Sequence, residues 1–267
     1  EDQIRGEAAT LSFFSERQYT NPMVIRIAGL AYQKGFGGHF HNDNSFAVFR
    51  DIPGIILACP SNGADAVEMM REAVRLAREE QRIVVFLEPI ALYMTRDLHQ
   101  EGDGLWTSVY RPAAEAKPIR LGQLGQYGDG RRLAIVSYGN GYYLSRQAAQ
   151  RLEAKGIDLR VIDLRWLAPL NTEAIIEAVA PCDHILIVDE CRESGSLSEA
   201  LMTLLQEQDC RAPTARITAT DSFIPLGRAA TSTLPGKESI VDAALKLISN
   251  TSGESQSEGS PADKTEL

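Results

Sequence analysis

Two histidines separated by a single residue are the side chains of this sequence that could take part in the largest number of reactions. His39 and His41 lie behind a pair of glycines in the stretch GGHFHNDNSFAVFRDIPG, residues 37–54, and the whole chain has four histidines. An imidazole, whose unperturbed pKa is about 6.5, can carry a proton in a catalytic pocket or bind a metal ion. From the residues alone, the pair is interpreted as metal ligands, as proton carriers or as polar residues at the mouth of a loop.

The metal interpretation lacks ligands that would complete a site. His39, His41 and Asp43 would lie on one side of an extended segment, and imidazole with carboxylate suits zinc or iron. A catalytic metal also needs a third committed ligand and an open position. The other histidines are poor partners, since His99 lies in an irregular segment and His184 begins a distant strand. We therefore assign no metal ligand in this chain.

The turn YGNGYYL, residues 138–144, has part of a dinucleotide-binding pattern. It follows a predicted strand and opens a helix, and Asp163 ends the next strand, where an acid would hold a ribose hydroxyl. However, the third glycine position is Leu144, whose side chain would obstruct the contact of helix and strand. Two glycines at such a turn are common for backbone reasons alone, so the pattern favours a structural turn.

Composition excludes several classes of protein. The chain has 267 residues and a net charge of −9, with no block of Lys and Arg, which argues against a nucleic-acid surface. Its four cysteines are scattered without a C-x-x-C pair, which fits a reducing compartment. No apolar run approaches the ~20 residues that span a membrane. We expect a cytoplasmic protein, or one of the mitochondrial matrix in a eukaryote.

Short apolar strands alternate with amphipathic helices along the chain, which predicts an α/β fold with a mostly parallel sheet. The predicted strands cover residues 22–29, 54–60, 82–89, 132–139, 158–165, 184–190 and 214–220. The predicted helices cover residues 62–80, 141–155, 170–181, 196–208 and 237–249, and Asn62 is the expected N-cap of the first of them. An N-terminal helix is also expected, with an apolar stripe of Ile4, Ala8, Leu11 and Phe14.

This pattern divides the chain into four segments. We expect a first domain over residues 1–100, a linker over 101–118, a second domain over 119–249 and a disordered tail over 250–267. The first helix begins without methionine, at the start of its apolar stripe. This is expected of a chain cut inside a larger protein, so the first domain would lack its N-terminal part, although a processed N-terminus explains the observation equally well.

Several motifs in a fixed order point to one family. The first half has DQIRGEAATLSFFS, NPMVIRIAG, the histidine stretch and VVFLEPIALY, and the second has IVSYGNG, GIDLRVIDLRWLAPLN and ILIVDECRESGSLSEAL. From about residue 2 to 248 the chain resembles the β chain of the thiamine-diphosphate-dependent 2-oxo acid dehydrogenases of the pyruvate and branched-chain type. The resemblance implies a partial thiamine-enzyme pyrimidine-type domain, followed by a transketolase C-terminal-like α/β domain.

The resemblance implies an oxidoreductase component that oxidatively decarboxylates a 2-oxo acid and transfers the acyl group to a lipoyl arm. His41 falls on the family's active-site histidine, and His39 is its neighbour in the same loop, so both are catalytic candidates. His41 would donate a proton to the departing sulfur or hydrogen-bond the carboxylate of the oxo acid. The Ser-Gln pair that usually follows this histidine is replaced by Asn42 and Asp43, which changes the contacts to substrate and lipoyl arm.

The implied cofactors are thiamine diphosphate and magnesium, held mainly by parts absent from this chain. In the family, the glutamate that contacts the aminopyrimidine lies upstream of the position of Glu1, and the α chain holds magnesium and diphosphate. No cofactor-binding residue is therefore assigned here, and the chain is expected to be inactive alone.

The implied partners are an α chain or α-like domain and a lipoyl-bearing acyltransferase. We expect a homodimer or an α2β2-like assembly, because large apolar patches on the surface usually mark interfaces. The candidate side chains of this partner surface are Phe13, Phe14, Phe36, Phe40 and Phe46.

Two alternatives stay open. The chain could be a non-catalytic dimerisation or regulatory module that has lost its cofactor contacts. It could also be another transketolase-like thiamine enzyme, such as one acting on sugar phosphates, which would need phosphate-binding Arg or His residues near the pocket. The sequence leaves undecided which 2-oxo acid is used and whether α and β parts are fused.

The resemblance also raises the question of a monovalent cation. In several relatives a loop before the VVFLEP-like strand holds such a cation with backbone carbonyls, an Asp and an Asn. Glu80 and Arg82 stand at those two positions. A guanidinium has no acceptor and cannot bind a cation, so we expect that the site is lost, and Arg82 could instead pair with Glu79 or Glu80. The alternative is that Arg82 points to solvent and the backbone carbonyls still hold an ion.

Overall fold

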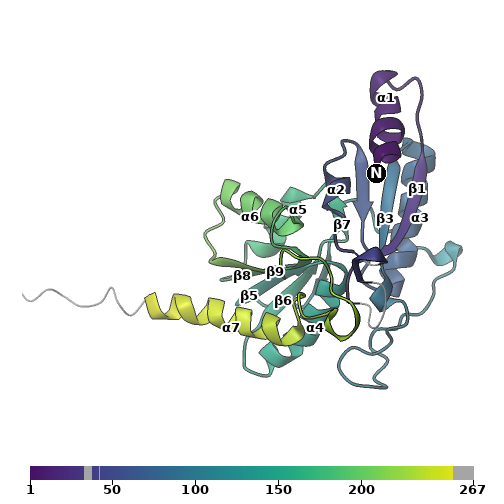
Figure 1. Cartoon of the computed structure of the whole chain (residues 1–267). Coiled ribbons are helices and arrows are strands. Elements are labelled where there is room, and N and C mark those ends of the chain that lie inside the picture. Colours follow the sequence, from purple (N-terminus) through teal and green to yellow (C-terminus); the bar gives the residue numbers. More distant parts are fainter. Residues whose placement is uncertain (33–37, 42, 255–267) are drawn as a thin grey trace, which may run out of the picture.

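The chain folds into two β-sheets side by side, with helices packed against them (Figure 1). The structure, a computed structural model, describes residues 1–32, 38–41 and 43–254. The strands are β1 (Met23–Gly29), β2 (Ile55–Ala58), β3 (Ile83–Pro89), β4 (Gly125–Tyr127), β5 (Leu133–Ser137), β6 (Leu159–Asp163), β7 (Trp166–Ala168), β8 (Ile185–Arg192) and β9 (Thr214–Ala219). The α-helices are α1 (Thr10–Phe14), α2 (Ala47–Arg50), α3 (Gly63–Glu80), α4 (Gly139–Glu153), α5 (Thr172–Val179), α6 (Leu197–Glu207) and α7 (Lys237–Glu254).

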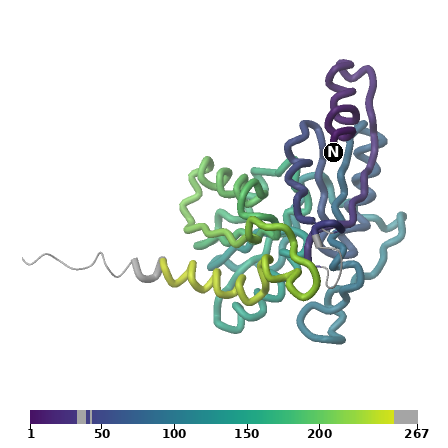
Figure 2. Tube along the Cα trace, viewed as in Figure 1, coloured from purple at the N-terminus to yellow at the C-terminus, as the bar shows by residue number. Residues whose placement is uncertain are grey.

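Short helical turns complete the chain. A π-helix, η1 (Ile4–Ala9), continues directly into α1, and the 3-10 turns are η2 (Gly38–Phe40), η3 (Ile90–Leu92), η4 (Ala113–Glu115) and η5 (Gly227–Ala229). The N-terminal helix projects from the body of the molecule, whereas α7 lies against the second sheet (Figure 2).

The first sheet has the strand order β1-β3-β2-β7, in which β1, β3 and β2 are parallel. All four residues of β2 are buried, and so are six of the seven residues of β3, as expected of strands covered on both faces. Helix α3 packs on one face, where Met69, Ala73 and Leu76 contact the sheet residues Ile56 and Phe86. Its N-cap is Asn62, whose side-chain oxygen accepts a hydrogen bond from Asp65 N at 3.0 Å, as predicted.

The second sheet has the strand order β4-β6-β5-β8-β9, and only β4 runs antiparallel to its neighbour. Helices α4 and α7 pack on one face, and α5 and α6 pack on the other. Helices connect most of the parallel strands, among them α3 between β2 and β3, α4 between β5 and β6 and α6 between β8 and β9, and the predicted α/β class with mostly parallel sheets is confirmed.

The two sheets share one apolar core. Leu57 and Val85 of the first sheet belong to the same buried cluster as Val136 and Ile187 of the second. Strand β7, which follows β6 in the chain, pairs antiparallel with β2 of the first sheet. The sequence did not predict β7, because three residues are too few for a period to be recognised. Strand β7, from residues 119–249, thus belongs to the sheet of residues 1–100, and the two expected domains share one core.

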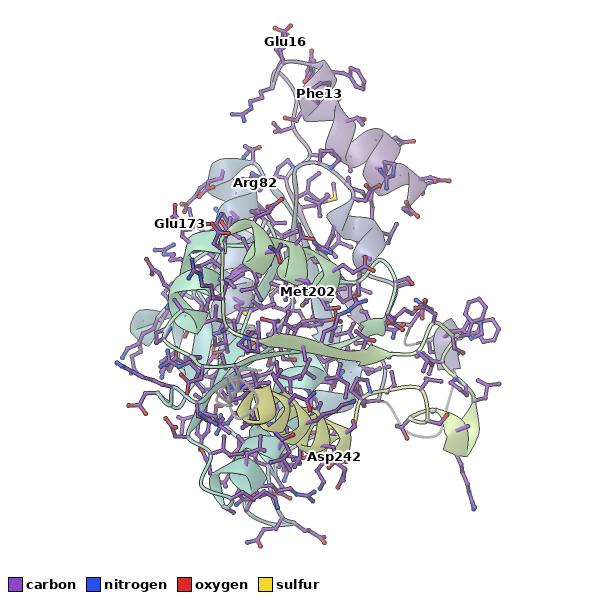
Figure 3. The ribbon with its side chains drawn as sticks, turned by 90° about the vertical axis from the view of Figure 1, so that its left-hand side faces the viewer. Phe13, Glu16, Arg82, Glu173, Met202 and Asp242 are labelled. Carbon is purple, nitrogen blue, oxygen red and sulfur yellow. The ribbon has the colours of Figure 1, made fainter. Side chains whose placement is uncertain are left out.

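The ends of the chain differ from the sequence-based expectations. Ile4 and Ala8 pack on the shared core, but Phe14 is 79% exposed, because α1 projects beyond the sheet (Figure 3). At the other end α7 continues to Glu254, past the predicted end at residue 249. Most of the expected tail, residues 255–267, lies outside the described residues.

Replacing Trp166 in β7 is expected to destabilise both halves of the chain together. Trp166 is 1% exposed and lies in the cluster under α3, so Trp166→Ala removes a buried indole and should lower the free energy of unfolding by about 3–5 kcal/mol. Urea denaturation followed by circular dichroism measures the change as a single transition. The matched control is Phe13→Ala, which removes a 78% exposed ring and should cost less than about 0.5 kcal/mol. Two separate transitions in the Trp166 variant would contradict the shared core.

Candidate functional site

The two histidines lie on a turn that follows β1. The 3-10 turn Gly38–Phe40 carries His39, and His41 comes directly after it. The His39 ring is half-buried and stacks on Phe40, with ring centroids 4.1 Å apart, and on Phe223, at 4.6 Å. Phe223 belongs to the loop between β9 and α7, which passes beside the segment after β1 (Figure 2). His41 is exposed. The turn thus lies where the two halves of the chain meet.

Hydrogen bonds from the second half hold the residues that follow the histidines. Asn44 is buried, and its Nδ2 donates to the backbone oxygen of Glu190 at 2.7 Å. The thiol of Cys191 lies 2.8 Å from the backbone oxygen of Asn44. Arg192 Nη2 contacts Asp43 Oδ1 at 2.9 Å. Three consecutive residues at the end of β8, 190–192, therefore hold the segment that follows the histidine turn.

Two adjacent carboxyl groups are buried at this end of β8. Asp189 Oδ1 accepts a hydrogen bond from the Tyr138 hydroxyl at 2.5 Å, and Asp189 Oδ2 accepts from Ser198 N at the start of α6, at 2.8 Å. Each contact satisfies one oxygen of a carboxylate that is 1% exposed. Asp189 therefore ties β5, β8 and α6 together.

Glu190 faces the junction of the two halves. Its carboxyl group accepts from the side chain and backbone N–H of Asn140, at 2.9–3.3 Å, and from the backbone N–H of Ala31. Burial raises the pKa of Glu190 to about 8, against the opposing effect of these donors. Glu190 is therefore mostly protonated, and so neutral, at neutral pH.

Of the metal ligands weighed from the sequence, Asp43 is engaged by Arg192 and His39 is covered by aromatic rings. Asn42, the other departure from the family pattern, lies outside the described residues. Within residues 1–32, 38–41 and 43–254, no group of three or more His, Cys, Asp or Glu side chains could hold a metal ion.

The glycines at the start of α4 are closely packed and leave no room for a ligand. Gly139 has a φ of +51°, and a Cβ added there would lie 3.2 Å from Sγ of Cys59, the residue that follows β2 of the first sheet. A Cβ on Gly141 would lie 2.3 Å from Ser137 Oγ. Asp163 is 1% exposed, and burial raises its pKa to about 7. Backbone shape and close packing thus account for the glycines, and the turn does not form a dinucleotide site.

A cavity of about 760 Å³ lies beside α3, at the carboxyl ends of β2 and β3. Arg26 and Glu88 pair on its wall at 2.5 Å, and the Tyr93 hydroxyl donates to Glu88. Two more arginines line it, Arg71 and Arg96. The sequence did not predict this cavity, because its lining residues come from four separate segments of the chain.

The five phenylalanines expected on a partner surface do not form one patch. Phe13, Phe14 and Phe40 are 78%, 79% and 76% exposed, but Phe46 is 4% exposed and packs edge-to-face on Tyr138. Phe46 is therefore a core residue, which corrects the expectation, and Phe36 lies outside the described residues. Phe13 projects at the far end of the N-terminal helix (Figure 3).

The ion pair expected for Arg82 is made by another residue. Arg75 contacts Glu80 at 2.8 Å and Glu79 at 3.5 Å, because it lies one helical turn before them on α3. Arg82 lies at the surface past the end of this helix (Figure 3).

Residues 122–240 match the family model of the transketolase C-terminal domain. The chain is 28% identical over 255 residues to the pyruvate dehydrogenase E1 component subunit beta of Bacillus subtilis, covering 92% of this chain and 71% of that protein. It is 28% identical over 224 residues to the 2-oxoisovalerate dehydrogenase subunit beta of the same organism, covering 82% of this chain and 63% of that protein. These matches confirm the resemblance seen in the motifs.

Solved structures support the same fold. One, titled as a split-gene transketolase in an inactive beta4 tetramer, matches with a TM-score of 0.64 at 20% identity over 91% of this chain and 73% of that chain. A transketolase mutant from Pichia stipitis matches with a TM-score of 0.60 at 14% identity over 94% of this chain and 33% of that chain. At these identities the likeness concerns the fold.

The buried Glu190 predicts that stability falls with rising pH. Its pKa is raised in the folded state, so the stability that its neutral form contributes is fully present below about pH 4.3 and is lost as the pH rises toward 8. Glu190→Gln stays neutral and should remove about 1–3 kcal/mol of this decline between pH 5 and 8, measured by urea denaturation. Glu193→Gln, on a side chain 67% exposed, should keep the wild-type slope. Equal slopes for wild type and Glu190→Gln would refute the assignment.

Proposed function

We propose that this chain is the β part of a thiamine-diphosphate-dependent 2-oxo acid dehydrogenase, which oxidatively decarboxylates a 2-oxo acid and transfers the acyl group to a lipoyl arm. Similarity to two β subunits of such enzymes over 92% and 82% of the chain supports this function. The observation that carries the proposal is the position of His41, on a turn held between the first sheet and the transketolase-type domain.

His41 and His39 have different roles in this proposal. His41 is exposed and can meet a substrate, where an imidazole donates a proton or binds the carboxylate of the oxo acid. His39 is stacked on two phenylalanines, one from each half of the chain, so it keeps the turn in place beside the reacting groups. The choice between proton donation and carboxylate binding by His41 stays open.

The described residues do not fit the magnesium–diphosphate part of the cofactor. Magnesium prefers several oxygen ligands in octahedral geometry, and the described part of the chain has no group of three or more His, Cys, Asp or Glu side chains that could hold a metal ion. We therefore derive no step through thiamine diphosphate. We propose that most of its contacts come from an α chain or α-like domain and from a segment upstream of the residues that match here.

The proposal includes two protein partners, an α chain or α-like domain and a lipoyl-bearing acyltransferase. The exposed Phe13 and Phe14 are the candidate contacts within a homodimer or an α2β2-like assembly. No helix within the described residues is long and apolar enough to cross a membrane. Free cysteines at 59, 182, 191 and 210 support a reducing compartment, which we propose is the cytoplasm, or the mitochondrial matrix in a eukaryote.

We further propose that residues 1–100 and 119–249 act as the pyrimidine-type and transketolase C-terminal-like domains, joined by the linker 101–118. The long irregular stretch between β3 and β4, which has only two 3-10 turns, supports this division. Since the two domains share a core, they would move as one unit.

A second candidate is a transketolase-like enzyme that acts on sugar phosphates. The cavity beside α3 favours it, because three arginines line that cavity. Two of them are already neutralised, Arg26 by Glu88 and Arg71 by Glu68 at 2.8 Å, which leaves less positive charge for a phosphate. The dehydrogenase function is therefore preferred.

The chain by itself should bind thiamine diphosphate weakly and decarboxylate no 2-oxo acid, because the magnesium–diphosphate contacts are missing. Calorimetric titration with thiamine diphosphate and magnesium measures the affinity. A submicromolar Kd for the chain alone would refute the expected division of the site. The same titration with the candidate α partner present is the positive control.

His41→Ala should lower the kcat of the enzyme assembled with its α partner by about 100- to 10,000-fold, because a group that transfers or holds a proton is removed. The assay follows lipoyl acylation with a panel of 2-oxo acids. His99→Ala removes a histidine of the irregular stretch after η3 and should leave kcat within about threefold. Full activity of the His41 variant would exclude its catalytic role.

A further inference from the structure

One guanidinium group connects the two segments that surround His39. Arg192 Nη2 pairs with Asp43 Oδ1 at 2.9 Å, and Arg192 Nε donates to the backbone oxygen of Ser222 at 3.2 Å. Asp43 lies two residues after His41, and Ser222 precedes Phe223, whose ring stacks on His39. Arg192 therefore bonds to Ser222, which adjoins Phe223, and to Asp43, which follows the turn that carries His39.

The Asp43 side is also fixed from its own segment. Asp43 Oδ1 accepts a second hydrogen bond from Asn44 N at 2.9 Å, and the backbone oxygen of Asp43 accepts from Leu30 N at the end of β1, at 3.3 Å. The Asp43 carboxyl group is thus held in one orientation. Because the guanidinium of Arg192 is planar and also bonds to Ser222, it fixes the loop after β9 relative to Asp43.

We propose that Arg192 and Asp43 are positioning residues that hold the His39–His41 turn in its reactive position across the junction of the two halves. This inference rests on the proposed function, since the reaction requires His41 to be placed beside the substrate. Small misplacements of a catalytic group reduce reaction rates strongly. Loss of the ion pair should therefore lower kcat much more than it lowers the stability of the fold.

The pair is suited to positioning because it contributes little to folding. The side chains of Arg192 and Asp43 are 24% and 28% exposed, and partly exposed ion pairs are weak contributors to stability. Asn44 and the shared core keep the segment folded without them. Loss of the pair should thus release the turn locally and leave the rest of the fold intact.

The first test observes the turn directly in the full chain. In the wild type, ring currents from Phe40 and Phe223 should shift the His39 ring proton resonances upfield. Asp43→Asn and Arg192→Gln should each lose most of the part of this shift that is due to Phe223. The resonances of His99 and His184 are internal references. Arg132→Gln, which removes an exposed ion pair with Asp183, is the matched control and should leave His39 unchanged.

The second test measures the enzyme assembled with its α partner. Each single variant should lower kcat about 10- to 100-fold with KM changed less than about threefold, and its Tm should change by at most about 4 °C. The double variant should be no worse than either single variant, because both remove one contact. The Arg132→Gln control should keep wild-type kcat.

The outcomes separate the positioning role from the proposed function. If the His39 ring proton resonances of Arg192→Gln stay at their wild-type positions, the positioning role is overturned, whatever the activity of the enzyme. A lost stack with unchanged kcat also overturns it, because the geometry would then be irrelevant to the reaction. If the assembled wild type lacks dehydrogenase activity, the proposed function fails, while the resonance shift still decides whether the pair orders the turn.

Discussion

The hydrogen bonds at the carboxyl end of β8 are the contacts on which the arrangement of the molecule depends. There Asn44, from the first half of the chain, donates to the backbone of Glu190, and the Glu190 carboxyl group in turn accepts from Ala31 and Asn140. These groups are buried, so losing one partner would leave a polar atom without water or protein to satisfy it. This cost fixes the two sheets in one relative position and places the histidine turn between them.

A buried site of this kind must limit its charge. Asp189 accepts hydrogen bonds from Tyr138 and Ser198, while burial raises the pKa of neighbouring Glu190, so that Glu190 is mostly neutral at neutral pH. Neutral amides donate to Glu190. Arg192 lies further out and pairs with Asp43 at the edge of the junction.

The arrangement explains why this chain is understood best as part of a larger enzyme. It provides a rigid platform and an exposed histidine, but within the described residues no cluster of acids could bind a metal ion. Two of its exposed aromatic residues, Phe13 and Phe14, belong to the N-terminal helix α1, which lies away from the second sheet (Figure 1). Under the proposed function, His41 and the cofactor contacts meet only when a partner is bound, so the activity would depend on assembly.

The sequence by itself determined the class of fold and most strands and helices, and it proposed His39 and His41 as candidate site residues. Those features are local: apolar periodicity, a cap at Asn62 and a distinctive motif order are all present along the chain. Only the tertiary structure decided that Phe46 is buried, that β7 joins the first sheet, and that Asp43 pairs with Arg192, 149 residues away. Such outcomes depend on which distant segments meet, and a one-dimensional pattern of polar and apolar residues does not specify that.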